Sequence, residues 1–247
     1  MQDRTSAETE YHVISLSDAQ FAAFCGRNSA ACIPFRHFTA VDGAKMTESP
    51  QAIGLLAPGI TNYSNGALGC AVSHRALWKQ CAASAKNIVI FEDDAIVRHD
   101  FMAQVDALMA RGKPWDVIFF GCNTDTVVSI PYTGGINLTG HFSTLYPSPA
   151  QLAGFVEQKT DVSLLRLKFA FGLCGYAVSP KGADKLIERC FPMDNRPVYI
   201  DEENRSFPAY GIDCMMVSAY PSIGAFMCFP PLVMTPNDQT TSQTVKA

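Results

Sequence analysis

The sequence predicts an α/β protein in which a mostly parallel, doubly wound sheet is flanked by helices. Short apolar runs rich in branched residues alternate with segments of helical periodicity through the first half of the chain. One of these runs, Ile88 to Phe91, delivers three consecutive acids to its carboxyl end, the edge at which open α/β sheets bind ligands. The 247 residues are 48% hydrophobic, which is enough to build a full core.

The chain is expected to begin with a strand, a helix and a second strand. His12 to Leu16 is a short apolar stretch with branched residues, and a polar segment of helical character follows it. Ile33 to Val41 has extended character, and Asp42-Gly43 then predicts a turn. Residues 50–65 are rich in proline, glycine and asparagine, which indicates a connection rather than a regular element.

A long helix is predicted from Ala67 to Ala83, because apolar residues recur there at every fourth position. Ser64 or Asn65 can cap its first turn. Ile88 to Phe91 is then uniformly apolar, as in a strand covered on both faces of a parallel sheet. The order helix then strand continues the alternation that a doubly wound sheet requires.

The alternation persists with a second amphipathic helix and another buried strand. Asp100 is expected to cap this helix, and Gly112 and Pro114 to end it. Val117 to Phe120 repeats the signature of a buried strand. This alternation extends over residues 12–122.

The second half, residues 123–235, is less regular. Thr124 to Pro149 is a long polar and glycine-rich stretch, either functional or mobile. Phe169 to Val178 predicts a strand, and Ser179-Pro180 provides an N-cap and a first helical residue. Residues 1–11 and 236–247 have little apolar content and are expected to be flexible ends of a single domain.

Composition excludes several functional classes. The net charge of −4 and the pI of about 5.7 argue against nucleic acid as a partner, because binding it requires a basic face. The nine cysteines are odd in number and lack C-x-x-C spacing, so reduced thiols are expected. Without a signal peptide or a long apolar run, a cytoplasmic protein is expected, with peripheral contact to the inner membrane surface left open.

The acids Glu92-Asp93-Asp94 repel one another at the end of a buried strand, and packing does not require them there. Glu92 and Asp94 lie two residues apart on an extended chain, so both can reach one Mn²⁺ or Mg²⁺. Such an ion would bind the two phosphates of a nucleotide-sugar. A helix cap or a solvated acidic turn remains the alternative interpretation.

Other catalytic signatures are missing or unsuited. Ser73-His74 is not a nucleophile and base, because neighbours on a helix point about 100° apart. The sequence contains neither a nucleophile elbow, nor a P-loop, nor a dinucleotide-binding glycine fingerprint. Hydrolases of the Ser/His type, ATPases and dehydrogenases are therefore disfavoured.

Several segments together resemble glycosyltransferase family twenty-five, which includes the bacterial lipooligosaccharide and lipopolysaccharide galactosyltransferases. The two most specific are the Gly-Cys-x-x-Ser-His helix and the Glu-Asp-Asp-Ala strand end. The segments keep the family's order over roughly residues 12–235, and they are Val13 to Leu16, Ile33 to Arg36, Ala40 to Gly43, Gly69 to His74, Phe91 to Ala95 and Gly172 to Ser179. After the first strand, where the family usually carries an Arg-rich segment, Ser17 to Asn28 of this chain contains only Arg27.

The resemblance implies a glycosyltransferase A-type, Rossmann-like fold, a UDP-hexose donor such as UDP-galactose, and a Mn²⁺-like ion in a DXD-like motif. It implies transfer to a glycan or glycolipid with inversion at the anomeric carbon, with residues 12–122 as the nucleotide-sugar-binding half and residues 123–235 as the acceptor-side half. The metal role is carried over to Glu92 and Asp94, and a donor-sugar contact to Asp93. Ser73 and His74 match family positions near the donor site. Two interpretations of His74 remain open: it binds a diphosphate oxygen, or it is a packing residue.

An inverting transfer needs a carboxylate that takes the proton of the acceptor hydroxyl. Asp213, which follows Gly211-Ile212 where the family places an aspartate near the acceptor, is the first candidate. Glu202 and Glu203 are the second. Asp42 is a candidate for binding ribose or uracil, because its turn lies at a strand end near the switch region.

Two other functional classes remain open on the sequence. One is a metal-dependent nucleotidyltransferase or phosphoesterase built on a similar acidic strand end. The other is a non-catalytic nucleotide-sugar-binding partner that has kept the fold. The acceptor and the donor hexose are not specified by these motifs, because loops determine such specificity.

Overall fold

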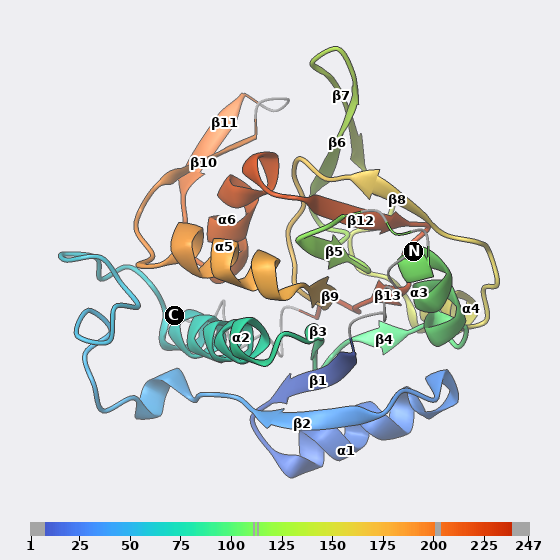
Figure 1. The fold of residues 1–247 in the computed structure, drawn as a ribbon, viewed down its shortest axis with the longest axis horizontal. Coiled ribbons are helices and arrows are strands. Elements are labelled where there is room, and N and C mark those ends of the chain that lie inside the picture. Colours follow the sequence, from blue (N-terminus) through green and yellow to red (C-terminus); the bar gives the residue numbers. More distant parts are fainter. Residues whose placement is uncertain (1–7, 111, 113, 201–203, 239–247) are drawn as a thin grey trace, which may run out of the picture.

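A seven-stranded sheet forms the centre of the molecule in the computed structural model, which describes residues 8–110, 112, 114–200 and 204–238 (Figure 1). Its strand order is β2-β1-β3-β9-β5-β12-β8. The strands, in chain order, are β1 (Thr9–Ser15), β2 (Phe35–Thr39), β3 (Asn87–Glu92), β5 (Val117–Phe119), β8 (Ser163–Arg166), β9 (Gly175–Val178) and β12 (Ala225–Phe229). β9 and β8 run antiparallel to their neighbours, and the other five strands run parallel to one another. The predicted fold class is therefore confirmed.

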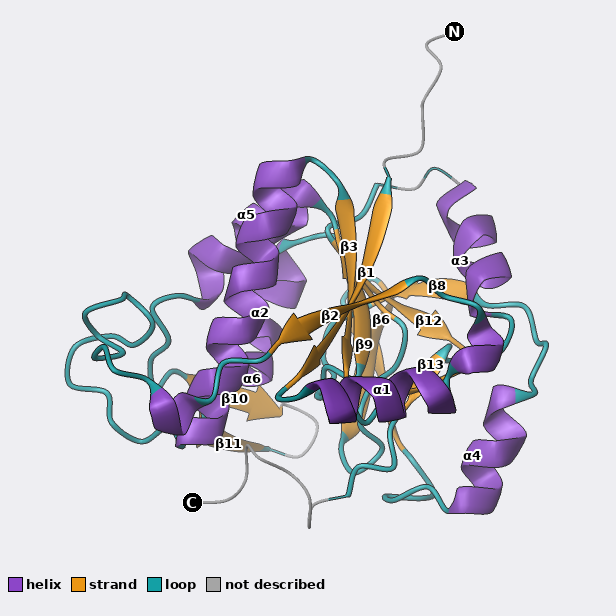
Figure 2. Cartoon of the chain, turned by 90° about the horizontal axis from the view of Figure 1, so that it is seen from below, coloured by secondary structure: helices purple, strands orange, loops and turns teal. Residues whose placement is uncertain are grey.

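Helices cover both faces of this sheet, as Figure 2 shows. One layer contains α2 (Asn65–Ser84), α5 (Pro180–Cys190) and α6 (Ile212–Ala219), and the other contains α1 (Asp18–Arg27), α3 (Phe101–Ala110) and α4 (Pro149–Val156). No helix among the described residues is long and apolar enough to cross a membrane.

Each face of the sheet has its own apolar core, because side chains alternate along a strand. In β3, Ile88 and Ile90 face the core shared with α2 and α5, while Val89 and Phe91 face the core shared with α1 and α3. All four side chains are fully buried. This explains why the sequence of β3 is continuously apolar until Glu92.

The predicted elements of the first half are confirmed, with small shifts at their ends. β1 begins at Thr9, so residues 9–11, assigned to a flexible N-terminus, are part of the sheet. The long helix α2 starts directly after the glycine-rich connection, with the Ser64 hydroxyl accepting from the Ala67 amide. Asp100 directly precedes α3. Its carboxylate accepts hydrogen bonds from Arg98 and from the side chain of Gln104.

One prediction for the second half is wrong. Phe169 to Val178 is a strand only from Gly175, because Gly172 adopts a positive φ of 88° that an extended chain does not have. The polar, glycine-rich stretch 124–149 contains a hairpin that was not predicted. It consists of β6 (Val127–Thr133) and β7 (Ile136–His141), which Gly134 and Gly135 join with positive φ angles.

The remaining elements are short. β4 (Ile96–Val97) pairs with β13 (Val233–Met234), and β10 (Pro197–Ile200) pairs with β11 (Arg205–Pro208). The 3-10 turns are η1 (Ser29–Ala31), η2 (Gly43–Lys45) and η4 (Tyr220–Ser222). Of the C-terminal segment predicted to be flexible, residues 236–238 are described, and Asn237 is buried; residues 239–247 lie outside the described part of the chain.

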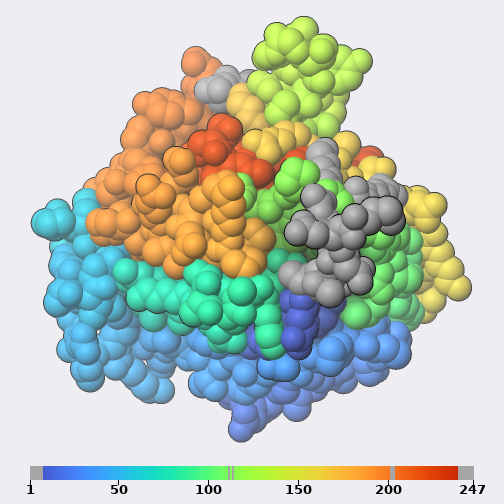
Figure 3. Space-filling model, viewed as in Figure 1, coloured from blue at the N-terminus to red at the C-terminus, as the bar shows by residue number. Residues whose placement is uncertain are grey.

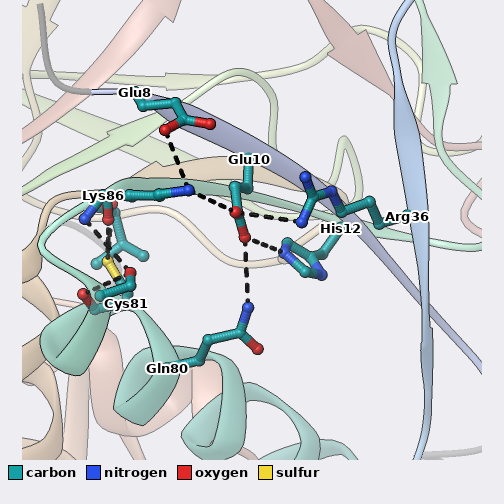
Figure 4. A network of polar contacts seen from close by, with 9 residues as sticks. Glu8, Glu10, His12, Arg36, Gln80, Cys81 and Lys86 are labelled. Carbon is teal, nitrogen blue, oxygen red and sulfur yellow. Dashed lines mark hydrogen bonds and ion pairs between the residues drawn. The ribbon is translucent and has the colours of Figure 1, made fainter.

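A buried carboxylate at Glu10 links several elements at the amino ends of β1 and β3 (Figure 4). The side chain is 9% exposed, and its partners come from β1, β2, α2 and the residue before β3: His12, Arg36, Gln80 and Lys86. Burial alone would raise the pKa of Glu10, but hydrogen bonds from His12 and Lys86 and the charge of Arg36 hold it below its ordinary value.

We expect Glu10→Gln to lower the free energy of unfolding by about 1–2 kcal/mol at neutral pH, because charged hydrogen bonds are lost. A lowered pKa stabilises the fold above the unfolded value of 4.5, and this contribution disappears as the pH falls through the folded value. Urea unfolding of both proteins across pH should therefore show a difference that shrinks below about pH 4.5. Equal stability at neutral pH would contradict the assignment.

Candidate active site

The acidic triplet lies at the carboxyl end of β3, beside the ends of the parallel strands β1 and β2. Glu92 is the last residue of the strand, and its carbonyl accepts from the Ala95 amide to close the turn. Arg27, at the end of α1, donates to the carbonyls of Asp93 and Ala95 at 2.5 and 3.4 Å. The single arginine of this region therefore fixes the backbone that presents the acids.

Asn28 completes this attachment from a buried position. Its side-chain nitrogen donates to the carbonyl of Ala95 at 3.0 Å, and its oxygen accepts from the amide of Val97 at 2.9 Å. A side chain that satisfies both backbone groups holds the turn rigidly relative to α1.

Ser73 of α2 fastens the loop after β2 to the helix. Its hydroxyl accepts from the Val41 amide at 2.9 Å and donates to the Gly69 carbonyl at 2.8 Å. A Cβ on Gly69 would lie 2.2 Å from the Val41 carbonyl oxygen, so only glycine allows this approach. Ser73 is fully buried and its hydrogen is used within the protein, which supports a positioning role for this predicted donor-site residue.

Asp42 stands in the loop that Ser73 holds. One carboxylate oxygen accepts from the Ala44 amide at 3.0 Å and caps η2, and the other pairs with Lys45 at 3.0 Å. Lys45 and the Ala44 amide hold the pKa of Asp42 below its ordinary value. The predicted turn is confirmed, and the nucleotide contact of Asp42 stays a prediction.

His74 is fully buried on α2, and its two ring nitrogens face different surroundings. Nδ1 lies 2.8 Å from the hydroxyl of Tyr176 on β9, which also accepts from Nε1 of Trp78 at 2.8 Å. Nε2 lies 3.8 Å from Oε1 of Glu92 and has no hydrogen-bond partner. Burial lowers the pKa of His74 to about 4, so the imidazole is neutral at physiological pH.

Burial raises the pKa of all three acids of the triplet, and neighbouring carboxylates raise those of Glu92 and Asp93 further. For Glu92, whose side chain is 35% exposed, the causes are burial and then the charges of Asp94, Asp213 and Asp93. Burial also raises the pKa of Asp94, while a hydrogen bond from the Thr235 hydroxyl at 2.5 Å and the charge of Arg27 oppose it. The positive charge of Arg27 lowers the pKa of Asp93 and Asp94 and so partly offsets the negative charge gathered at this turn.

Asp213 joins this cluster from the opposite half of the chain. It lies in the first turn of α6, and its Oδ1 accepts from the Cys214 amide at 2.8 Å. Burial raises its pKa, whereas hydrogen bonds from the backbone of Cys214 and Gly172 lower it. The negative charge of Asp213 raises the pKa of Glu92 and of His74, so its carboxylate interacts with the predicted metal site.

The residues at this edge suit a divalent cation. Glu92 supplies a partly exposed carboxylate beside a neutral imidazole with an orphaned nitrogen, and Asp94 has a second carboxylate oxygen besides the one that contacts Thr235. A cation would relieve both the repulsion among the acids and the unsatisfied nitrogen. The candidate bases Glu202 and Glu203 lie outside the described residues.

Sequence reasoning missed several residues that build this site. Tyr176 orients His74, Thr235 holds Asp94, and Gly172 binds Asp213, yet their roles depend on contacts with segments far away along the chain. Cys70 was expected only to be a reduced thiol. Two signals pointed to it: its place in the Gly-Cys-x-x-Ser-His segment, and its spacing of four from His74, which puts both on one face of α2.

Comparisons with known proteins place the chain in a family. The model of glycosyltransferase family 25, described as LPS biosynthesis protein, matches residues 8–202. A rat (Rattus norvegicus) protein named "Probable inactive glycosyltransferase 25 family member 3" is 28% identical over 138 residues, 49% of this chain and 24% of that protein. A solved structure, mannose-1-phosphate geranyltransferase from Thermus thermophilus, aligns with a TM-score of 0.34 and 15% identity over 74% of this chain and 60% of that one. The family model covers well over half of the residues, and the chain belongs to glycosyltransferase family 25.

Proposed function

We propose that the protein is a metal-dependent inverting glycosyltransferase that moves a hexose, with galactose the first candidate, from a UDP-sugar to a glycan acceptor such as lipooligosaccharide. Family membership supports the transfer of a sugar. The observation that carries the proposal is the position of Glu92 at the carboxyl end of β3, 3.8 Å from the orphaned Nε2 of His74. Burial and then the charges of Asp94 and Asp213 raise the pKa of Glu92 there. Such a concentration of carboxylates is costly unless a cation shares it.

Glu92 and Asp94 would hold Mn²⁺ or Mg²⁺, which when bound supplies positive charge for the diphosphate of the leaving UDP. Asp93 and the loop at Asp42 would contact the donor sugar and nucleoside. Ser73 keeps that loop against α2 through the Val41 amide, so it positions the donor site without touching the donor. Arg27 holds the acidic turn in place for the same purpose.

Asp213 is the proposed base. Its carboxylate takes the proton of the acceptor hydroxyl as the oxygen attacks the anomeric carbon from the face opposite UDP, and the C–O bond to the diphosphate breaks. The raised pKa of Asp213 favours this task because a more basic carboxylate accepts a proton more readily. Glu202 and Glu203 remain the second candidates.

A donor and acceptor screen monitored by UDP release tests the proposal. Free UDP should form only when acceptor and metal are both present, EDTA should stop the reaction, and Mn²⁺ should restore it. Release of phosphate or a nucleoside monophosphate without an acceptor would instead support a nucleotidyltransferase or phosphoesterase. Donor binding without any turnover would support a non-catalytic nucleotide-sugar-binding partner.

We also propose that the β6–β7 hairpin makes peripheral contact with the membrane that carries a glycolipid acceptor. It projects from the body of the molecule, as the space-filling view shows (Figure 3). Residues 126–156 contain no Asp, Glu, Lys or Arg. The hairpin and the segment after it expose large apolar side chains: Tyr132, Ile136, Leu138, Phe142, Leu145 and Tyr146. Uncharged aromatic and aliphatic surfaces of this kind suit a lipid interface.

We expect Ile136→Ser combined with Leu138→Ser to reduce partition into phosphatidylcholine vesicles at least about tenfold, because each lost side chain forfeits roughly 1.5–3 kcal/mol of burial. Vesicle co-sedimentation measures this, with Leu16→Ser as control, since Leu16 is exposed at 41% but lies after β1, away from the hairpin. Partition that is unchanged in the double variant would contradict the lipid contact and leave a protein partner to explain the exposed hairpin.

A further inference from the structure

Two more side chains, Cys70 and His74 on α2, lie where they can reach the ion that Glu92 is proposed to bind. The Cys70 sulfur, a His74 ring nitrogen and a Glu92 carboxylate oxygen all lie within 4.8 Å of one another. Among the described residues, no other group of three or more His, Cys, Asp or Glu offers ligand atoms this close. We propose that Cys70 Sγ and His74 Nε2 are ligands of the same divalent ion as Glu92, forming a mixed sulfur, nitrogen and oxygen site.

The helix brings the first two ligands together. Cys70 and His74 are four residues apart on α2, so their side chains project from one face in successive turns. That face packs against the end of β3, where Glu92 leaves the sheet. Cys70 is half-buried and Glu92 is 35% exposed, so an ion reaches the cluster from the open side of Glu92.

The orphaned nitrogen of His74 gives an independent reason for a ligand. His74 is fully buried, and its Nε2 points at Glu92 from 3.8 Å, too far for a hydrogen bond. A buried nitrogen without a partner is unfavourable. Two ligands at about 2.0–2.2 Å from a tetrahedral ion lie about 3.4 Å apart, close to the observed separation.

Tyr176 prepares the imidazole for metal binding. Trp78 has only a donor, so its Nε1 hydrogen occupies one lone pair of the Tyr176 oxygen. Nδ1 of His74 lies 2.8 Å from the same oxygen, in a hydrogen bond whose direction depends on the tautomer of the imidazole. When Nε2 binds an ion, Nδ1 carries the hydrogen and donates it to the second lone pair of Tyr176. Histidine ligands of metals are commonly oriented in this way by a partner on the other ring nitrogen.

The donor set has consequences for which ion binds. Thiolate and imidazole ligands favour Zn²⁺ and Co²⁺ over Mg²⁺, which prefers oxygen alone. The Cys70 thiol gives up its proton to solvent when the sulfur binds the ion. Glu92, at 35% exposed, leaves the cluster open to solvent, so the diphosphate of the proposed donor could complete the coordination of the ion. This inference rests on the proposed function only because both assign Glu92 as a ligand of the same metal ion.

Cobalt titration of the full chain tests the ligand set without any turnover. We expect wild-type protein loaded with Co²⁺ to show a thiolate-to-metal charge-transfer band, Cys70→Ser to lose that band, and His74→Gln to weaken Co²⁺ binding at least about tenfold. Cys81→Ser, a buried cysteine at the far end of the same helix, and Cys32→Ser, the exposed cysteine, should leave the band unchanged.

The wild-type protein also supplies a test that needs no substitution. Pulsed electron paramagnetic resonance of the Mn²⁺-loaded chain should detect a coordinated imidazole nitrogen, whether or not His74→Gln folds. No charge-transfer band in the wild type, a band that persists in Cys70→Ser, or no nitrogen coupling to Mn²⁺ would overturn the assignment of the corresponding ligand. These results are independent of UDP release, so a protein that binds Co²⁺ as expected yet transfers no sugar would refute the proposed function alone.

Discussion

Glu92→Gln is expected to reduce sugar transfer by about 10³-fold or more, the largest effect of any single change in the chain. The substitution keeps the size of the side chain but removes the charge that would hold the cation, and the ion's stabilisation of the leaving diphosphate is worth several kcal/mol. Initial rates of UDP release at saturating Mn²⁺ measure the effect. Glu157→Gln, at an exposed glutamate on the outer side of the molecule, is the matched control and should retain the wild-type rate.

Stability separates this loss of function from a loss of fold. The ionised carboxyl of Glu92 is destabilised by burial and by Asp94, Asp213 and Asp93, so neutralising it removes repulsion from the metal-free protein. Glu92→Gln should therefore melt at the same temperature as the wild type or higher without metal, and Mn²⁺ should raise the Tm of the wild type only. A variant that keeps its transfer rate, or is stabilised by Mn²⁺ as strongly as the wild type, would remove Glu92 from the metal site.

Asp213→Asn is expected to lower transfer by roughly 10²-fold or more while UDP-sugar binding changes little. The amide oxygen of asparagine can still accept from the Cys214 amide, which Asp213 does at 2.8 Å, so the first turn of α6 is preserved. Only the capacity to take a proton is lost. Single-turnover rates and donor affinity by calorimetry measure the two quantities separately.

The position of Asp213 beside Glu92 calls for a second measurement on the same variant. If Asp213 is the base, Asp213→Asn should leave the affinity for Mn²⁺ nearly unchanged. If Asp213 is a metal ligand, the substitution should lower both the affinity for Mn²⁺ and turnover. Asp106→Asn, on a helix of the opposite layer, serves as control for a change of charge alone. Near-normal turnover in Asp213→Asn would move the base to Glu202 or Glu203, and weakened Mn²⁺ binding would assign Asp213 to the metal.

Local signals in the sequence predicted the first half of the fold well. Strands β1 and β3 and helix α2 follow from short apolar runs, four-residue periodicity and a serine cap, all of which act between near neighbours. The helix α5 follows from Ser179-Pro180 in the same way. The sequence also contains a hairpin pattern for β6–β7, because Gly134-Gly135 lies between segments in which apolar and polar residues alternate. The polar composition of the segment led to its interpretation as a connection.

The sequence by itself determined that three acids end a buried strand and that Cys70, Ser73 and His74 occupy one helix. It did not determine what these side chains face, because that depends on contacts between residues about 20 to 140 positions apart. Only the tertiary structure turned Ser73 to the Val41 loop, aimed His74 Nε2 at Glu92, and brought Asp213 from α6 beside the acids. The physical reason is burial: desolvation and like charges set the chemistry of these groups, and both arise only when distant segments close over one edge of the sheet.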